Sequence, residues 1–275
     1  MTIEPIDFEG HACVRLEGET TAVVVAISAG PRILGLIGAD GNLMAVLPDS
    51  GIDRPDGRRF RFRGGHRLWA APEDPDVTYQ PDDEACSVTE VPDGVRVEAP
   101  VDGAGLAKTI VVRRCTDSWT IDHEIRNASG AGATLAPWAV TQLRTGGEAI
   151  LPSSTDERGP RADRSVVLWP YTDPGDPRVR FGVDAIRIEA IPEGAPLKLG
   201  VAPGRGSVSY RLGAEVFEKR VDVDPTATYP DRGAAIQVYA CADFCELETL
   251  GALRRLPPGA AASHRETWTV RRLGA

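Results

Sequence analysis

The feature that most constrains the fold of this chain is a series of short segments, rich in β-branched residues, in which apolar and polar side chains alternate. Examples are residues 21–28 (TAVVVAIS), 106–115 (LAKTIVVRRC), 118–127 (SWTIDHEIRN) and 266–273 (ETWTVRRL). Stretches such as PDG, NASGAG, PEGAP and LPPGA separate these segments and have the composition of turns. No stretch of useful length has the 3.6-residue period of a helix. The pattern therefore predicts an all-β protein made of short antiparallel strands.

The spacing of these segments predicts the number of domains. Strand and turn signals recur about every 8–12 residues, which is typical of a β-sandwich. The chain has 275 residues, a length at which sandwiches often form one domain. We therefore expect a single domain over residues 1–275, a large sandwich of two antiparallel sheets. Residues 152–180 contain few apolar side chains, and we expect them to form a long excursion over one edge or face of the sheets.

Composition and charge argue against several classes of partner. The net charge is −9, whereas a general nucleic-acid binder needs a basic surface to neutralise phosphates. No stretch approaches the roughly 18 apolar residues of a membrane span, and residues 1–10 lack the pattern of a secretory signal. The five cysteines are scattered and odd in number, which favours reduced thiols and a cytoplasmic location. Nothing in the sequence indicates a homo-oligomer.

Three segments stand out, in this order along the chain: residues 61–74 (RFRGGHRLWAAPED), 124–152 (EIRNASGAGATLAPWAVTQLRTGGEAILP) and 238–270 (VYACADFCELETLGALRRLPPGAAASHRETWTV). Together they resemble the galactose mutarotase-like group, which includes the aldose 1-epimerases. With the strands between them, the resemblance covers most of the chain. It implies a mutarotase-like supersandwich of two large sheets, whose concave face binds sugar rings.

The resemblance also implies which residues would hold a sugar. A sugar ring has hydroxyls around its edge and apolar C–H patches on its faces, so its site needs a flat aromatic side chain beside charged or amide groups. Trp69 or Trp138 would cover a face of the ring, and Arg63, Arg67 and Gln142 would bind its hydroxyls. Each tryptophan has a structural alternative, because a tryptophan in a strand is more often part of the core.

The chemistry of the aldose 1-epimerases needs a general acid and a general base, and neither a metal nor a cofactor, so we expect no cofactor here. In that family the acid is typically a histidine and the base is a glutamate near the C-terminus. In this chain Pro137 and Trp138 occupy the place of the family's histidine. His66 and His123 are the candidate replacements. We prefer His66, because His123 alternates with isoleucines on one strand face, as a packed residue would.

The glutamate of the family has two candidates, Glu246 and Glu248 in the segment FCELETLG. A strand places both on one face, about 6.6 Å apart. Two carboxylates at this separation repel each other, and the pKa of one rises, which suits an acid or a base that works near neutral pH. Lys219 could balance either carboxylate or bind an anionic sugar. The structural alternatives are a solvated strand face for the glutamates and an exposed strand position for the lysine.

These observations lead to a functional hypothesis with two alternatives. We expect a carbohydrate-binding protein, and more specifically a cofactor-free isomerase of the aldose 1-epimerase type that acts on a monosaccharide or a derivative. The first alternative is a non-catalytic sugar-binding protein that has lost the family's histidine. The second is a lyase or glycoside hydrolase on the same fold, against which the missing export signal and extra domain count.

Overall fold

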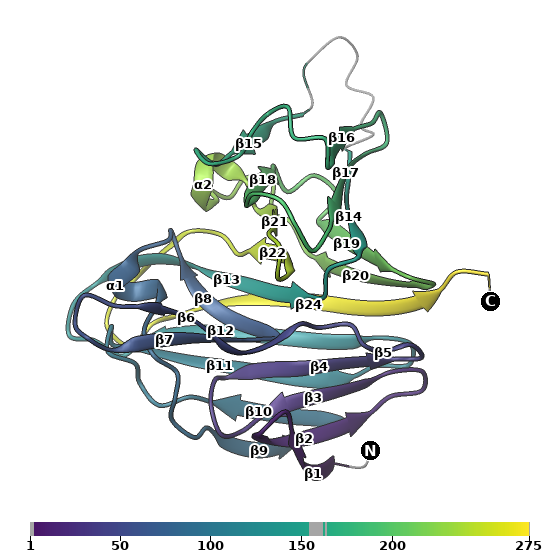
Figure 1. Cartoon of the computed structure of the whole chain (residues 1–275). Coiled ribbons are helices and arrows are strands. Elements are labelled where there is room, and N and C mark those ends of the chain that lie inside the picture. The colour runs from purple at the N-terminus through teal and green to yellow at the C-terminus, as the bar shows by residue number, and fades with distance from the viewer. Residues whose placement is uncertain (1–2, 154–161, 163, 275) are drawn as a thin grey trace.

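The structure, a computed structural model, describes residues 3–153, 162 and 164–274. Two large antiparallel sheets and a two-stranded ribbon account for its strands (Figure 1). The first sheet contains β1 (Ile3–Phe8), β2 (His11–Glu17), β3 (Ala22–Ala26), β4 (Arg32–Gly38), β5 (Gly41–Asn42), β8 (His66–Ala71), β13 (Ala133–Leu143), β15 (Val166–Leu168), β18 (Leu197–Val201), β21 (Ile236–Ala240), β22 (Cys245–Leu250) and β23 (Arg254–Leu256). Its order is β1-β2-β3-β4-β8-β13-β22-β21-β18-β15, with β5 paired to β4 and β23 to β13.

The second sheet packs against the first. It contains β9 (Ser87–Val91), β10 (Gly94–Glu98), β11 (Leu106–Arg114), β12 (Trp119–Asn127), β14 (Gly147–Pro152), β16 (Val179–Phe181), β17 (Ala185–Ala190), β19 (Ser207–Leu212), β20 (Glu215–Val221) and β24 (Ala261–Arg272). Its order is β16-β17-β14-β19-β20-β24-β12-β11-β10-β9. The ribbon pairs β6 (Val46–Asp53) with β7 (Arg59–Gly64). The expectation of an all-β fold with antiparallel sheets is confirmed.

Helix is confined to two single turns in the part of the chain that the structure describes. These are α1 (Pro75–Thr78) and α2 (Pro230–Gly233). Neither turn is long or apolar enough to cross a membrane. Of the excursion expected at residues 152–180, residues 154–161 and 163 lie outside the described residues. The described part contains β15 and the start of β16, each of which forms the last strand of one sheet. In Figure 1 both strands lie near the top of the molecule, while β1 to β4 lie near the bottom.

The apolar segment 32–38, which shows no clear period in the sequence, forms the buried strand β4. Its glycines make this possible, because each leaves room for a side chain of a neighbouring strand. A Cβ atom at Gly35 would lie 3.0 Å from a methyl group of Val24, and one at Gly38 would collide with the carboxylate of Glu215. The glycines that disrupt the sequence pattern are therefore packing contacts of a strand.

Three of the four histidines lie in the interior between the two sheets, in a hydrogen-bonded chain. His123 Nδ1 donates to the carbonyl oxygen of His264 at 3.0 Å, so its Nε2 atom accepts. His66 Nε2 donates to that atom at 2.7 Å, and His66 Nδ1 accepts from the hydroxyl of Thr141 at 2.8 Å. These contacts fix one neutral tautomer for each of His66 and His123 and connect β8 and β13 with β12 and β24.

A buried ion pair lies next to this chain. The Nζ atom of Lys219 is 2.7 Å from Glu266 Oε1, and both side chains are fully buried. Lys219 also donates to the carbonyl oxygens of Ala139 and Leu247 in the opposite sheet, at 3.2 and 3.0 Å. Burial acts to raise the pKa of Glu266, but the ammonium group of Lys219 keeps that pKa below its usual value. The pair therefore connects the two sheets through charge-assisted hydrogen bonds.

The buried histidines predict that the protein loses stability in mild acid. Burial lowers the pKa of His66 and His123, and it lowers the pKa of His264 to about 3. Below pH 6.5 the unfolded chain binds protons that the folded chain does not, so the free energy of unfolding decreases as the pH is lowered. For His264 alone this loss is about 2–3 kcal/mol between pH 6.5 and 4.5. Urea titrations followed by circular dichroism at several pH values measure it.

The variant His264→Gln isolates this contribution, because glutamine retains an amide N–H near the position of Nε2 and does not titrate. We expect its unfolding free energy to depend less steeply on pH than that of the wild type over this range. His11→Gln is the control, since His11 is only half-buried and lies outside the chain of buried histidines. Parallel curves for the wild type and His264→Gln would contradict the interpretation.

Candidate functional site

The outer face of the first sheet, which is turned away from the second sheet, carries most of the residues that the sequence singled out. Successive side chains of a strand point to opposite faces. On β8, Arg67 and Trp69 therefore share one face, whereas His66 points to the interior between the sheets. On β22, Glu246 and Glu248 share the outer face, as the sequence analysis expected. The central strands thus present aromatic and charged side chains on a surface of their own.

A cavity of about 520 Å³ lies over this face, a size within the range of small-molecule sites. The central strands β8, β13, β18, β21 and β22 supply its floor. The ribbon β6–β7, the segment around α1 and three loops supply its walls. The lining residues are Ser50, Ile52, Phe62, Trp69, Glu73, Tyr79, Trp138, Tyr171, Gly194, Pro196, Lys198, Tyr239, Cys241, Ala242, Asp243, Phe244 and Glu246. Seven of them are aromatic, and four carry a charge.

Glu246 is the carboxylate at the floor of this cavity, and two neighbours fix its position. Arg67 Nη2 donates to Glu246 Oε1 at 2.8 Å, and Gln142 Nε2 donates to the same atom at 3.0 Å. The guanidinium carbon of Arg67 lies 3.9 Å from the ring centre of Trp69 and 5.4 Å from that of Phe62. Arg67 and Gln142 are buried behind the lining, so they orient the carboxylate that faces the cavity.

Several polar atoms behind this floor have no hydrogen-bond partner among the described residues. They are Nε and Nη1 of Arg67, Oε1 of Gln142 and Oε1 of Glu248. Buried polar atoms in proteins are normally hydrogen-bonded to protein or to ordered water.

Glu248 lies deeper than Glu246 and has no exposed surface. Its Oε2 atom accepts from Trp138 Nε1 at 2.7 Å and from Lys198 Nζ at 2.8 Å. Burial raises the pKa of Glu248 to about 7, although Lys198 acts in the opposite direction. Burial therefore favours the neutral form of this carboxyl group, which does not line the cavity itself.

Lys198 lines the cavity, although it was not among the site residues expected from the sequence. Its Nζ atom lies 4.7 Å from the ring centres of both Trp138 and Trp169. A signal was available in the sequence, because Lys198 lies between Leu197 and Leu199 and so points to the opposite face from these apolar residues. The remaining step, that this face is the floor of a cavity, depends on the pairing of β18 with β21.

Three of the selected residues lie away from the cavity lining. His66 points to the opposite face of β8 and hydrogen-bonds within the interior. Lys219, on β20, pairs with Glu266 and not with either glutamate of β22. Arg63 forms ion pairs with Asp82, at 3.0 Å, and with Asp83. Trp69, Trp138 and Glu246 do line the cavity, and Arg67, Gln142 and Glu248 contact those residues from behind.

One group among the described residues has the spacing of a metal site, namely His66, His123 and Glu266, whose ligand atoms lie within 4.8 Å of one another. The chemistry does not favour a metal there. Lys219 already neutralises Glu266, and the two imidazoles are hydrogen-bonded directly to each other at 2.7 Å. A metal would have to displace a buried ammonium group and break that bond. We therefore assign this group a structural role.

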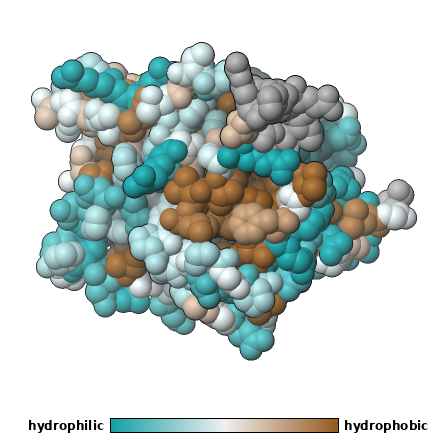
Figure 2. All heavy atoms as spheres, turned by 90° about the horizontal axis from the view of Figure 1, so that it is seen from above, coloured by the Kyte–Doolittle hydropathy of each residue, from teal (hydrophilic) through white to brown (hydrophobic). Residues whose placement is uncertain are grey.

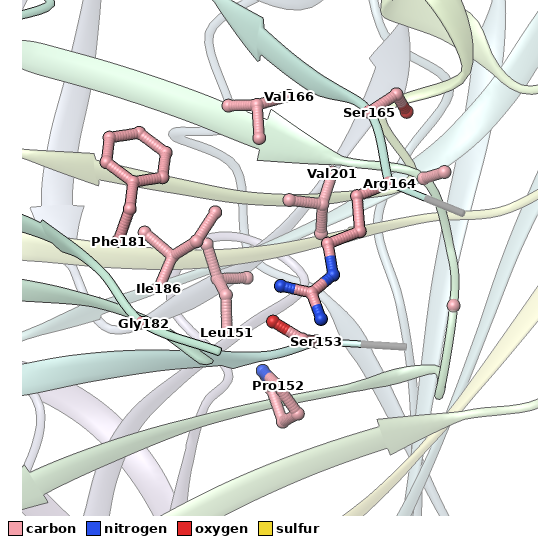
Figure 3. Close-up of a pocket in the computed structure, with 12 residues that line it drawn as sticks. Leu151, Pro152, Ser153, Arg164, Ser165, Val166, Phe181, Gly182, Ile186 and Val201 are labelled. Carbon is pink, nitrogen blue, oxygen red and sulfur yellow. The ribbon is translucent and has the colours of Figure 1, made fainter. Parts of the chain in front are cut away.

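A second, smaller cavity of about 150 Å³ lies between the ends of the two sheets. Figure 3 shows its lining, which is mostly apolar and includes Leu151, Phe181 and Ile186 beside Arg164. Seen from above in Figure 2, the molecule also has an apolar patch next to the residues drawn in grey. The described residues that line this cavity include no carboxylate and no histidine. The larger cavity is therefore the better candidate for acid–base chemistry.

Comparison with known proteins identifies the fold. No protein-family model matches the chain, and no curated protein matches it either. Solved structures do. A candidate aldose 1-epimerase from Escherichia coli K12 matches 96% of this chain and 100% of its own, with a TM-score of 0.57 and 13% identity. A galactose mutarotase-like protein from Lactobacillus casei matches 94% of this chain and 100% of its own, with a TM-score of 0.58 and 9% identity.

A galactose mutarotase-like protein from Clostridium acetobutylicum also matches, over 99% of this chain and 98% of its own, with a TM-score of 0.52 and 9% identity. The chain therefore has the fold of the aldose 1-epimerase and galactose mutarotase-like proteins, as the three sequence segments implied. At these sequence identities the likeness concerns the fold alone.

The buried ion pair between Arg67 and Glu246 predicts that replacing Arg67 strongly destabilises the folded protein. Removing one member of a buried ion pair costs about 3–5 kcal/mol, because the other charge stays buried without a partner. We expect Arg67→Met to lower the free energy of unfolding by that amount, and Arg67→Met/Glu246→Gln to lose less than the sum of the two single variants. Urea denaturation measures both effects.

The control for this prediction is Arg59→Met. Arg59 pairs with Asp53 at 2.5 Å, but both side chains are exposed, so we expect a cost below about 1 kcal/mol. Equal losses for Arg67→Met and Arg59→Met would show that the buried pair at the cavity floor has no special role.

Proposed function

We propose that this chain binds a monosaccharide in the larger cavity and interconverts its anomers without a metal or a cofactor. The observation that supports this proposal best is the shared lining of Trp69, Trp138 and Glu246, which combines flat apolar surfaces with an oriented carboxylate. The ring centres of the two tryptophans lie 5.2 Å apart and their planes are inclined at 63°. Both side chains are largely buried, at 6% and 3% exposure, so only small parts of the two rings border the cavity. Sugar rings, with apolar faces and a polar edge, fit such a lining.

The proposed reaction uses Glu246 as the general base. In the closed ring the carboxylate would take the proton of the C1 hydroxyl, the ring would open to the aldehyde, and closure on the other face would give the second anomer. Arg67 and Gln142 hold the carboxylate by Oε1 and leave Oε2 of Glu246 available for this contact. The names of the structures with the same fold, aldose 1-epimerase and galactose mutarotase, are consistent with this chemistry.

The second candidate function is sugar binding without catalysis. It is favoured by Trp138, which stands where the family has its histidine and which uses its indole N–H to hold Glu248. None of the described residues that line the cavity is a histidine. Under this alternative the aromatic lining would bind the ring, and Glu246 would only accept hydrogen bonds from its hydroxyls.

An activity measurement separates the two functions. We expect the wild type to accelerate the interconversion of α- and β-anomers of a neutral aldohexose, followed by polarimetry or NMR saturation transfer. Glu246→Gln should lower kcat about 10²–10⁴-fold, because it removes a general base while retaining the shape, and should leave the Kd within about tenfold. Binding without any acceleration by the wild type would support the alternative.

The charges of the lining predict which sugars bind. Three lining residues carry a carboxylate, namely Glu73, Asp243 and Glu246, and the only cation among the described lining residues is Lys198, which pairs with Glu248. We therefore expect glucose or glucosamine to bind more tightly than glucose 6-phosphate at low salt, because a phosphate group would meet net negative charge. Isothermal titration at two salt concentrations tests this expectation, and tighter binding of the phosphate would contradict it.

A further inference from the structure

The proposed isomerisation needs a proton donor as well as a base, and the donor must reach the ring oxygen while Glu246 reaches the C1 hydroxyl. No histidine is found among the described lining residues. Tyr79 is committed to the carboxylate of Glu73, and burial raises its pKa. The remaining candidate donor is Lys198, the cation among the described lining residues.

The sheet places Lys198 opposite Glu246 across one intervening strand. Glu246 on β22 pairs with Tyr239 on β21, and Tyr239 pairs with Lys198 on β18. Neighbouring strands are about 4.8 Å apart, so the Cα atoms of Glu246 and Lys198 are separated by about 10 Å. Tyr239 lies between them and also lines the cavity. The side chain of Lys198 reaches across β21, because its Nζ atom contacts Glu248 on β22 and the ring of Trp138 on β13. The ammonium group of Lys198 and the carboxylate of Glu246 thus line the same cavity.

Three contacts fix the position of the ammonium group of Lys198. Glu248 Oε2 accepts one of its hydrogen bonds at 2.8 Å, and the rings of Trp138 and Trp169 flank Nζ at 4.7 Å each. Glu248 is the only hydrogen-bond acceptor that the described residues offer to Nζ. Glu248 itself has no exposed surface and does not line the cavity. Lys198 therefore separates Glu248 from any ligand in the cavity.

From this arrangement we infer that Lys198 is the catalytic proton donor and that Glu248 is the positioning residue behind it. The inference rests on the proposed function and adds the second proton-transfer group to it. In the opening step Glu246 takes the proton from the C1 hydroxyl, Lys198 gives a proton to the ring oxygen, and the bond between C1 and the ring oxygen breaks. After rotation about C1–C2, both protons return and the ring closes on the other face, so that both side chains regain their starting states.

Eight titratable groups contact Lys198 or line the same cavity, and they have to be considered in any pH profile. They are Glu246 and Glu248 on β22, Tyr239 on β21, Tyr171 in the loop after β15, Cys241 and Asp243 in the turn between β21 and β22, and Glu73 and Tyr79 beside α1. Burial raises the pKa of the three tyrosines and of Cys241, so none of these four ionises near neutral pH. Glu248 is the group among them whose pKa burial moves to about 7.

The first experiment uses Lys198→Met, Lys198→Ala and the control Lys108→Met. Lys108 matches Lys198 in burial and in having a carboxylate partner, Asp102, at 2.8 Å, but it lies outside the cavity. With glucose as the probe, we expect Lys198→Met to lower kcat at least 100-fold while the Kd changes less than tenfold. Added ethylamine should restore part of the activity of Lys198→Ala, because a free ammonium ion can occupy the space. Lys108→Met should behave as the wild type.

The second experiment measures the pH dependence of kcat for Glu248→Gln. If Glu248 acts through Lys198, the wild-type profile has an inflection near pH 7 that Glu248→Gln lacks, and kcat falls by about tenfold or less. A purely structural Glu248 would change the stability of the protein without removing the inflection. Circular dichroism of each variant shows that it is folded.

The outcomes separate this inference from the proposed function. If the wild type accelerates anomer interconversion but Lys198→Met retains more than a tenth of its kcat, or ethylamine does not rescue Lys198→Ala, the inference is overturned and the isomerase function stands. If the wild type has no activity on glucose, galactose or glucosamine, the proposed isomerase function and the inference are overturned together. A loss of kcat with retained binding, followed by rescue, supports both.

Discussion

The alternation of side chains along three central strands decides where most residues of the candidate site lie. On β8, β13 and β22, one set of residues faces the second sheet and the other set faces the cavity. His66 and Arg67 are neighbours in sequence, yet one belongs to the hydrogen-bonded interior and the other holds Glu246. A shift of one residue in the pairing of these strands would exchange the two sets. The register of the first sheet is therefore the constraint on which both the interior and the cavity depend.

Different ion pairs lie on the two sides of the first sheet. Between the sheets, Lys219 and Glu266 neutralise each other, and Lys219 also donates to two backbone carbonyl oxygens of the first sheet, so the pair connects the two layers. On the outer face, Arg67 and Lys198 each hold one glutamate of β22. The carboxylates of Glu246 and Glu248 thereby stand in different environments although they are only two residues apart, one facing the cavity and one sealed behind it.

Much of the fold was accessible from the sequence, since alternation and turn residues indicate strands and the three family-like segments indicate how the strands are arranged. The shared face of Glu246 and Glu248 followed from the strand period alone. The ion-pair partners of the charged residues could not be predicted from the sequence, because these partners depend on which strands lie side by side. Lys219 lies on a strand of the second sheet and meets Glu266, whereas Lys198 reaches Glu248 across β21. His66 shows the same limit, because its sequence neighbours indicated a site residue while its position on the strand directs it into the interior.

The distribution of the five tryptophans gives the molecule two separate sets of optical reporters. Trp69 and Trp138 line the cavity and Trp169 flanks Lys198, whereas Trp119 and Trp268 are buried in the core between the sheets. Quenching or a spectral shift of the first set would record a molecule entering the cavity, and the emission of the second set would record separation of the sheets. Occupancy and unfolding can therefore be followed in the unlabelled protein by replacing one set of indoles at a time.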